Sequence, residues 1–189
     1  MKEREELHDS EELEELNEDD GQKLKIKDVI KDLIIVVVIV LLIGFFVKPI
    51  IVEGASMNPT LQDDDYLLIS KQSYTFGEPE RGDIIVFPHH ESTEDSLYIK
   101  RVIAIPGDHL EIHDGNVYIN GELQYEDYIK SGAITEGYVN LVIPEGQVFV
   151  MGDNRENSSD SRYFGTVNIE EVTGEVFVRL WPLSEIGRP

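Results

Sequence analysis

The sequence predicts a mainly β fold preceded by one membrane-spanning helix. An uninterrupted apolar run, residues 33–47, lies near the amino end. After residue 53 the chain consists of short runs rich in Val, Ile, Tyr and Phe, which favour strands, and turn residues separate these runs. No long amphipathic helical pattern interrupts them.

Length and composition limit the classes of function. The 189 residues, of which 41% are hydrophobic, allow one medium-sized domain with attachments. The net charge of −22 is opposite to what a phosphate backbone attracts, so we expect no nucleic-acid partner. The chain has no cysteine, which excludes disulfides, a thiolate nucleophile and a cysteine-based zinc site.

The amino-terminal segment is strongly acidic. Residues 1–22 hold eleven Asp and Glu side chains against Lys2 and Arg4, and few apolar side chains that could be buried. We therefore predict that residues 1–28 form a disordered tail whose last part, next to the apolar run, is basic.

The apolar segment has three interpretations: a cleaved signal peptide, a transmembrane anchor or a buried core helix. With its apolar flanks it covers residues 29–52, which is long enough to cross a bilayer. A signal peptide needs a short basic leader and a small-residue cleavage site, whereas this leader is long and acidic and Val52–Ala55 is a poor site. We predict a single-pass anchor. The lysines that crowd its amino side place the tail in the cytoplasm and residues 53–189 outside.

Seven strands are expected in residues 53–189. Their ranges are Tyr66–Lys71, Asp83–Phe87, Leu97–Ile105, His109–His113, Val117–Asn120, Val148–Met151 and Glu175–Trp181. Turn signals such as Pro106-Gly107-Asp108 and Asn120-Gly121 separate them. Because such turns crowd between about residues 108 and 144, we expect a hairpin-rich insertion there.

Ser56 is a candidate nucleophile just after the anchor. Gly54 permits close approach of another backbone, and Pro59 restricts the residue before it to extended forms, so Ser56 is expected in a well-defined turn. A serine hydroxyl also needs a base, because it is a poor nucleophile at neutral pH. The alternative is a serine that is merely solvated in a turn.

Lys100 is the candidate base. Period-two alternation places Lys100 and Arg101 on opposite faces of their strand, and one of these cations must face apolar side chains if both faces are covered. A lysine titrates near 10.4, and burial lowers its pKa because it disfavours the charged form. The alternative is a lysine that extends to water at a sheet edge. Histidine is the more ordinary base, and the candidates are His89, His90, His109 and His113.

A third polar segment, Gly152–Arg162, follows an apolar strand. Alternation brings Ser158, Asp160 and Arg162 to one side of it. There the two charged groups could pair, and the serine hydroxyl could accept a hydrogen bond from a lysine amine. The alternatives are a solvated turn or a calcium loop, although the two arginines in the segment oppose a cation.

Together these segments resemble the bacterial type I signal peptidases. Gly-Ala-Ser-Met-Asn-Pro-Thr-Leu at 54–61 is similar to their nucleophile box, Lys-Arg-Val-Ile-Ala-Ile-Pro-Gly-Asp at 100–108 to their general-base box, and Met151–Gly165 to a third conserved box. The similarity runs from the anchor to Pro182. It implies a signal-peptidase-like β-sheet catalytic domain behind one transmembrane helix, as in Gram-positive members.

The resemblance implies a membrane-bound serine endopeptidase that removes signal peptides from exported preproteins, cleaving after small residues in an Ala-x-Ala pattern. Ser56 would be the nucleophile and would hold the oxyanion through its backbone N–H, and Lys100 would be the general base. Ser158 would orient the lysine amine, with Asp160 and Arg162 as a supporting ion pair. We expect no cofactor and no metal. The expected partners are secreted preproteins, the lipid bilayer and, close by, the Sec translocon.

One position departs from the family pattern. Some members carry a serine two residues before the nucleophile, whose hydroxyl helps to hold the oxyanion, but this chain has Gly54. The Ser56 N–H must then supply more of that stabilisation. An anchored β-rich binding protein, or a protease for one dedicated substrate, remains an alternative. The self-cleaving SOS repressors share Ser–Lys chemistry but need a DNA-binding region, which an acidic tail and a membrane helix do not provide.

Overall fold

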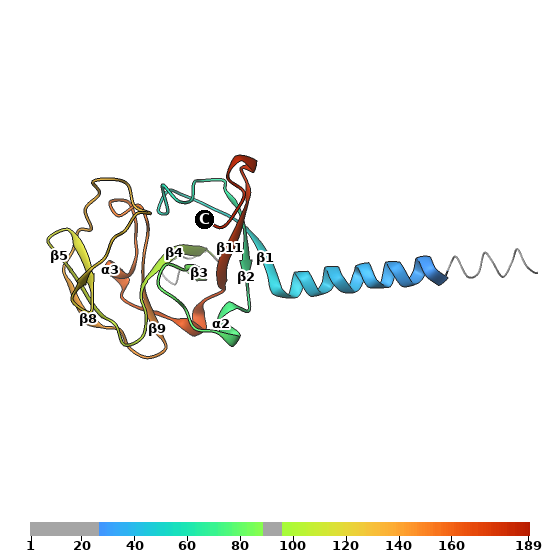
Figure 1. Cartoon of the computed structure of the whole chain (residues 1–189), viewed down its shortest axis with the longest axis horizontal. Coiled ribbons are helices and arrows are strands. Elements are labelled where there is room, and N and C mark those ends of the chain that lie inside the picture. The colour runs from blue at the N-terminus through green and yellow to red at the C-terminus, as the bar shows by residue number, and fades with distance from the viewer. Residues whose placement is uncertain (1–26, 89–95) are drawn as a thin grey trace, which may run out of the picture. The chain divides into compact units, whose positions relative to one another are not determined.

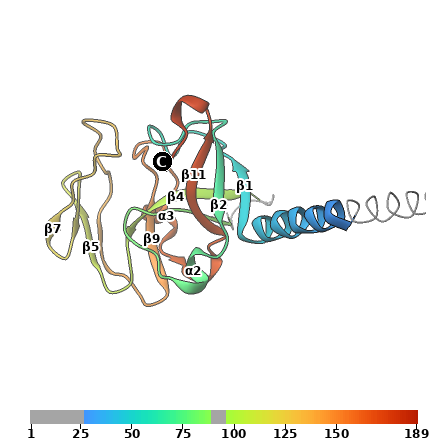
Figure 2. The same cartoon turned by 45° about the vertical axis from the view of Figure 1, so that its right-hand side comes forward.

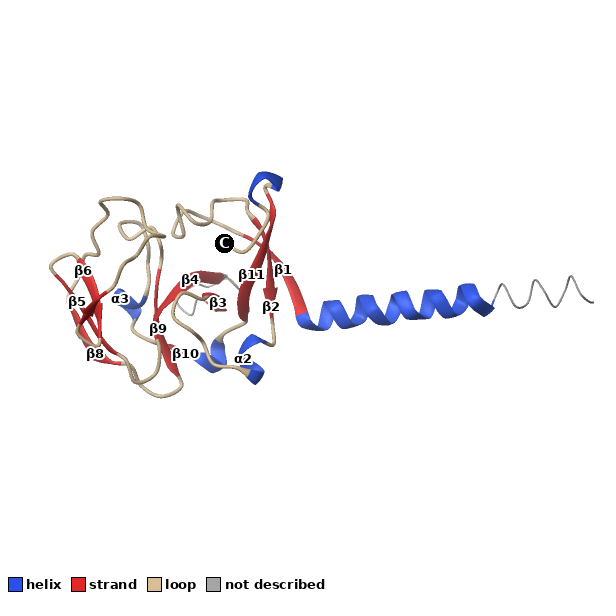
Figure 3. Cartoon of the chain, in the orientation of Figure 1, coloured by secondary structure: helices blue, strands red, loops and turns tan. Residues whose placement is uncertain are grey.

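The computed structural model describes residues 27–88 and 96–189. The predicted acidic tail up to residue 26 and the pair His89 and His90 lie outside the described residues. Two compact units meet in sequence at residues 45 and 46. The described part of the first is one helix, Lys27–Phe46, whose 20 residues and mean hydropathy of 2.9 make it a candidate membrane span. The second unit is built mainly from strands (Figure 3).

The helix is shorter than the anchor expected from the sequence, since it ends at Phe46 and not at residue 52. The next five residues form β1 (Val47–Ile51), which pairs antiparallel with β2 (Tyr66–Ser70). Pro49 explains the change, because it cannot donate to a helical ladder and disfavours helical backbone in the residue before it. Apolar character alone did not separate the end of the helix from this strand.

The second unit contains two antiparallel sheets. The larger has the strand order β1-β2-β11-β3-β4-β9-β10 and the smaller β7-β6-β5-β8. Their remaining strands are β3 (Ile84–Pro88), β4 (Leu97–Ala104), β5 (His109–His113), β6 (Asn116–Ile119), β7 (Glu122–Leu123), β8 (Val139–Val142), β9 (Gln147–Met151), β10 (Val167–Asn168) and β11 (Gly174–Trp181). Short helical turns are α2 (Ser73–Phe76), α3 (Ser161–Phe164), η1 (Ile169–Glu171) and η2 (Leu183–Glu185).

The mainly β prediction is confirmed, and each predicted strand matches an observed one to within one residue at either end. Four strands were not predicted from the sequence: β1, β7, β8 and β10. Two of these, β7 and β10, have only two residues each, which is too short for an alternating pattern to be recognised. β8 is exposed along most of its length, so it too carries no clear alternation.

The smaller sheet is formed within residues 109–142, inside the segment predicted to be an insertion. It lies at the end of the domain away from β1 and β2 (Figures 1 and 2). Its buried face, which includes Leu110 and Ile112, packs against Phe149 and Met151 of β9. The insertion therefore shares a hydrophobic core with the larger sheet.

The centre of the larger sheet is covered on both faces. In β3, Ile84 and Val86 belong to one hydrophobic cluster, whereas Ile85 and Phe87 belong to another. β4 lies beside β3, so its side chains also enter protein on both faces. This double covering determines the environment of the two adjacent cations on β4.

Candidate functional site

A hydroxyl and an amine meet beside β4. Ser56 lies in the loop after β1, and the next side chain, Met57, is buried in the core and holds this loop against the sheet. Lys100 extends from β4. Its Nζ donates hydrogen bonds to Ser56 Oγ at 2.8 Å and to the carbonyl oxygen of Ile99 at 3.0 Å. The structure therefore brings the candidate nucleophile and the candidate base into direct contact.

Lys100 is almost completely removed from water, with 2% of its surface exposed. Burial lowers the pKa of its amine to about 8, against the opposing attraction of the Asp160 and Asp153 carboxylates. Its Nζ also lies 4.7 Å from the centre of the Tyr98 ring. With such a pKa, roughly one amine in ten is neutral at pH 7, so a proton acceptor is present under ordinary conditions.

The contact lies in a groove of about 720 Å³. One wall is the segment from Lys48 to Met57, which comprises most of β1 and the loop after it, and another is the start of β4. β1 is an edge strand of the larger sheet, and β9 pairs with β4 only from Arg101 onward. The groove thus runs between two strand segments, a geometry suited to an extended peptide.

The third polar segment approaches the same groove. Asp160 is fully buried and accepts two hydrogen bonds of 2.9 Å each from Arg162. The two charged groups pair as expected, but not through strand alternation, because Asp160 caps the helical turn α3 that contains Arg162. Asp160 also accepts a hydrogen bond from the backbone N–H of Gly152 at 3.1 Å. A Cβ at position 152 would overlap Ser158 Oγ and the carbonyl oxygen of Ser56, so glycine is required for this close approach.

Ser158 does not make the hydrogen bond that the sequence analysis assigns to it. Its Oγ is buried next to Gly152 without a hydrogen-bond partner among the described residues. The Lys100 amine donates instead to Ser56 and to a backbone carbonyl. Ser158 therefore lies beside the loop that follows β1 and carries Ser56, which we call the nucleophile loop. Its contact with the amine is not formed in this structure.

Arg101 is the second buried cation of β4, with 7% of its surface exposed. It binds both carboxylate oxygens of Asp153, at 2.9 and 2.7 Å, and the Thr60 hydroxyl donates to the same carboxylate. This network ties the nucleophile loop, β4 and the third polar segment together. The sequence analysis missed it, although a buried arginine requires a carboxylate partner, and that requirement was the available signal.

Asn154 is a further residue that the sequence analysis missed. Its backbone N–H donates to the carbonyl oxygen of Ser56 at 3.0 Å, and its Nδ2 donates to the carbonyl oxygen of Ala55 at 2.9 Å. The segment after β9 thus holds the backbone of the candidate nucleophile, Ser56. Nothing in the local pattern of an asparagine in a polar loop indicates so distant a partner.

Gly54 has a conformational reason to be glycine. Its φ of +88° lies in the region that residues with a side chain rarely adopt, and its N–H donates to Asp63 Oδ1 at 2.7 Å. The residue is exposed at the rim of the groove. The position therefore supplies a backbone turn and no side-chain donor.

The other candidate groups are engaged elsewhere. His109 and His113 belong to the smaller sheet, where His109 contacts Asn140 and His113 stacks on Tyr118. Neither histidine lines the groove. Within residues 27–88 and 96–189, no group of three His, Asp or Glu side chains is arranged to hold a metal ion.

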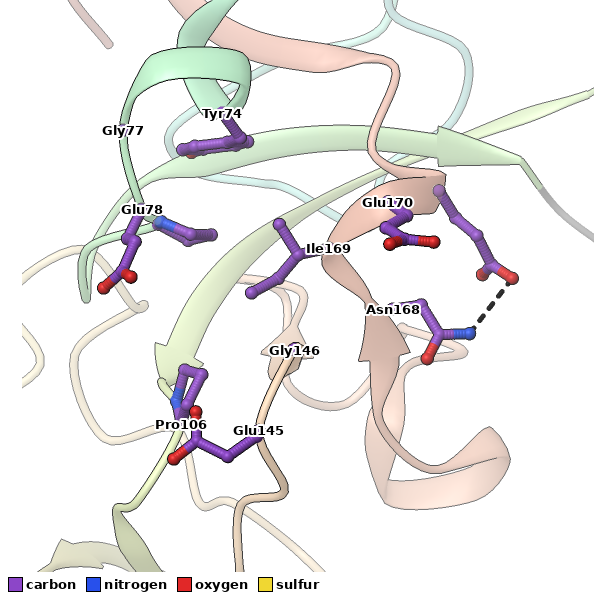
Figure 4. Close-up of a pocket in the computed structure, with 11 residues that line it drawn as sticks. Tyr74, Gly77, Glu78, Pro106, Glu145, Gly146, Asn168, Ile169 and Glu170 are labelled. Carbon is purple, nitrogen blue, oxygen red and sulfur yellow. Dashed lines mark hydrogen bonds between the residues drawn. The ribbon is translucent and has the colours of Figure 1, made fainter.

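A second hollow, of about 530 Å³, is formed by residues near α2, η1 and the turn before β9 (Figure 4). Its lining is acidic and includes Glu78, Glu145, Glu170 and Glu171. None of the site residues predicted from the sequence lies in it. Ser56 and Lys100 line the groove beside β4 instead.

Comparisons with known proteins give one consistent result. Residues 26–181 match the family described as signal peptidase, peptidase S26. The probable signal peptidase I-2 of Synechocystis is 42% identical over 140 residues, which cover 72% of this chain and 64% of that protein. Signal peptidase IB of Staphylococcus aureus is 37% identical over 158 residues, which cover 75% of this chain and 81% of that protein. A solved signal peptidase I from Enterococcus faecalis shares 36% identity, with a TM-score of 0.45, over 52% of this chain and 97% of that one.

Proposed function

Because the chain belongs to the signal peptidase family, peptidase S26, we propose that it is a membrane-bound serine endopeptidase that removes signal peptides from exported preproteins. The observation that carries the proposal is the contact of 2.8 Å between Lys100 Nζ and Ser56 Oγ. The amine in this contact is buried and its pKa is lowered to about 8. A serine beside a base that is partly neutral is the arrangement that nucleophilic catalysis requires.

In the proposed reaction, neutral Lys100 accepts the proton of Ser56 as Oγ attacks the scissile carbonyl. The Ser56 N–H stabilises the resulting oxyanion, and the lysine then gives its proton to the leaving amine. Water then attacks the acyl-enzyme, Lys100 takes the proton of the water and returns it to Ser56 Oγ, and the signal peptide leaves with a free carboxylate. The reaction needs no cofactor in this scheme.

Three further residues are proposed to support these steps. Asp160 and Arg162 hold the third polar segment in place, through the ion pair and the hydrogen bond to Gly152 described above. Ser158 Oγ is buried and has unused acceptor capacity next to the nucleophile loop. We assign to it the orientation of the Lys100 amine during the reaction, a contact that is not formed in this structure.

The substrate is proposed to bind as an extended strand in the groove. β1 and the start of β4 present backbone groups on two sides, and an added strand can pair with such edges. Successive side chains of a strand point to opposite sides, so the residues one and three positions before the cut face the same wall. We propose that this wall accepts only small side chains at both positions, the Ala-x-Ala pattern.

The full chain in detergent, incubated with a preprotein that carries Ala-x-Ala, should cut after the second alanine. Replacement of that alanine by leucine should lower kcat/KM by about a hundredfold, because the added methylene groups do not fit a shallow pocket. Replacement of the residue between the two alanines is the control and should have little effect. Mass spectrometry of the products identifies the cut. Cleavage at an unrelated site, or equal rates for alanine and leucine, would contradict the proposed substrate.

We further propose that the protein is a single-pass membrane protein with its amino end in the cytoplasm and residues 53–189 outside. The lysines at the amino side of the helix predict this orientation, because positively charged residues are enriched on the cytoplasmic side of membrane helices. It would place the groove on the side where preproteins emerge, near the Sec translocon, and confine enzyme and substrate to one membrane surface. Protease added to spheroplasts should digest the carboxyl-terminal domain. Protection of this domain from the protease would indicate the opposite orientation.

A further inference from the structure

Asn154 holds two successive carbonyl groups of the nucleophile loop. Its side-chain Nδ2 donates to the Ala55 oxygen at 2.9 Å, and its backbone N–H donates to the Ser56 oxygen at 3.0 Å. The Ala55 oxygen also accepts from the N–H of Asn58 at 3.2 Å, within the turn. The peptide planes on both sides of Ser56 are therefore fixed from the third polar segment, almost a hundred residues away in sequence.

The orientation of a carbonyl fixes the orientation of the N–H in the same peptide plane. The bond between Ala55 and Ser56 is trans, since the cis bonds in the described chain precede Pro59 and Pro182. In a trans peptide the C=O and the N–H point in opposite directions. A donor that binds the Ala55 oxygen therefore directs the Ser56 N–H away from Asn154.

The Ser56 N–H is the proposed oxyanion donor. It makes no hydrogen bond within the described residues, so it is available to a ligand. Gly54 has no hydroxyl that could donate a second hydrogen bond to the oxyanion. Some family members hold the oxyanion with both this N–H and a serine hydroxyl, whereas here the N–H acts alone. A tilt of the Ala55–Ser56 peptide plane would therefore weaken the hydrogen bond to the oxyanion with no second donor to compensate.

We propose that Asn154 is a positioning residue that orients the Ser56 N–H toward the developing oxyanion. The inference rests on the proposed function, because it assumes that Ser56 is the nucleophile. Asn154 acts through the backbone of Ala55 and Ser56 and touches neither the substrate nor the Lys100 amine. Its contribution is thus confined to the transition state, where the oxyanion exists.

The Asn154→Ala variant of the full chain should show a kcat lower by about 10- to 100-fold, with KM changed less than about twofold, since misdirection costs less than complete loss of a donor. A peptide aldehyde, which forms a tetrahedral adduct with Ser56, should lose affinity by the same factor. The pH dependence of kcat/KM should stay unchanged, because the surroundings of Lys100 are intact. A role limited to folding would instead lower the melting temperature and the number of active sites that titrate, with normal kcat per site.

Glu156→Ala is the matched control, because Glu156 lies exposed in the same segment and does not line the groove. It should keep wild-type kcat and aldehyde affinity. An Asn154→Ala enzyme with normal kcat per active site and normal aldehyde affinity would overturn the positioning role while leaving the Ser–Lys proposal intact. Cleavage that survives in Ser56→Ala would overturn the proposed function itself, so the two failures are distinguishable.

Discussion

Ser56→Ala will reduce the rate of preprotein cleavage by at least about 10⁴-fold, with little change in stability. The substitution removes the oxygen that would form the acyl-enzyme. A water molecule in its place would not be held in position for attack and could not form a covalent intermediate. The Ser56 side chain is only half-buried, and the loop is held by Met57, by Asn154 and by the Thr60 network, so the fold does not depend on the hydroxyl. Single-turnover cleavage and thermal unfolding measure the two parts of this prediction.

Ser184→Ala provides the comparison, since Ser184 is exposed in η2 and lies outside the groove. This variant should cleave at the wild-type rate. Substantial cleavage by folded Ser56→Ala would mean that the nucleophile is another group or that the reaction proceeds without a covalent step. Both outcomes would end the Ser–Lys assignment.

The features that the sequence predicts best are those that depend on local pattern. Alternation and turn residues located seven strands, because a strand covered on one or both faces leaves a regular signal in few residues. The same alternation separated Lys100 from Arg101 on β4. Burial of Lys100 then follows from the sheet, in which β3 and β9 flank its strand and both faces are covered.

The features that the sequence did not reveal depend on contacts between distant segments. Asn154 and Asp153 reach the nucleophile loop from a segment about 90 residues further along, with no spacing rule that indicates the partner. The end of the apolar helix at Phe46 was missed for another reason, because Ile50, Ile51 and Val52 continue the apolar run after Lys48 and Pro49. In the first case a tertiary contact decides the structure, whereas in the second Pro49 was an available local signal.

Burial of Lys100 lowers the stability of the folded chain, but it favours the proposed reaction because it lowers the pKa of the amine. Its folded pKa of about 8 lies below the usual 10.5, so the unfolded chain binds more protons than the folded one between these values. Below pH 8 the buried charge therefore costs stability, and the cost is relieved as the pH rises toward 10.5. The proposed reaction needs the neutral amine, and kcat/KM should accordingly increase with pH and level off above about 8.

Lys100→Arg should abolish cleavage at every pH at which the protein is folded, a loss of at least about 10⁴-fold. Arginine keeps the positive charge but does not lose its proton in this range, so it cannot accept the proton of Ser56. Because guanidinium is larger than the amine and the site is closely packed, Lys100→Met serves as the second variant: it keeps the length of the side chain and removes the charge. It should be folded, equally inactive and without a pH-dependent limb. Activity in either variant that still rises through pH 8 would show that the titrating base is a different group.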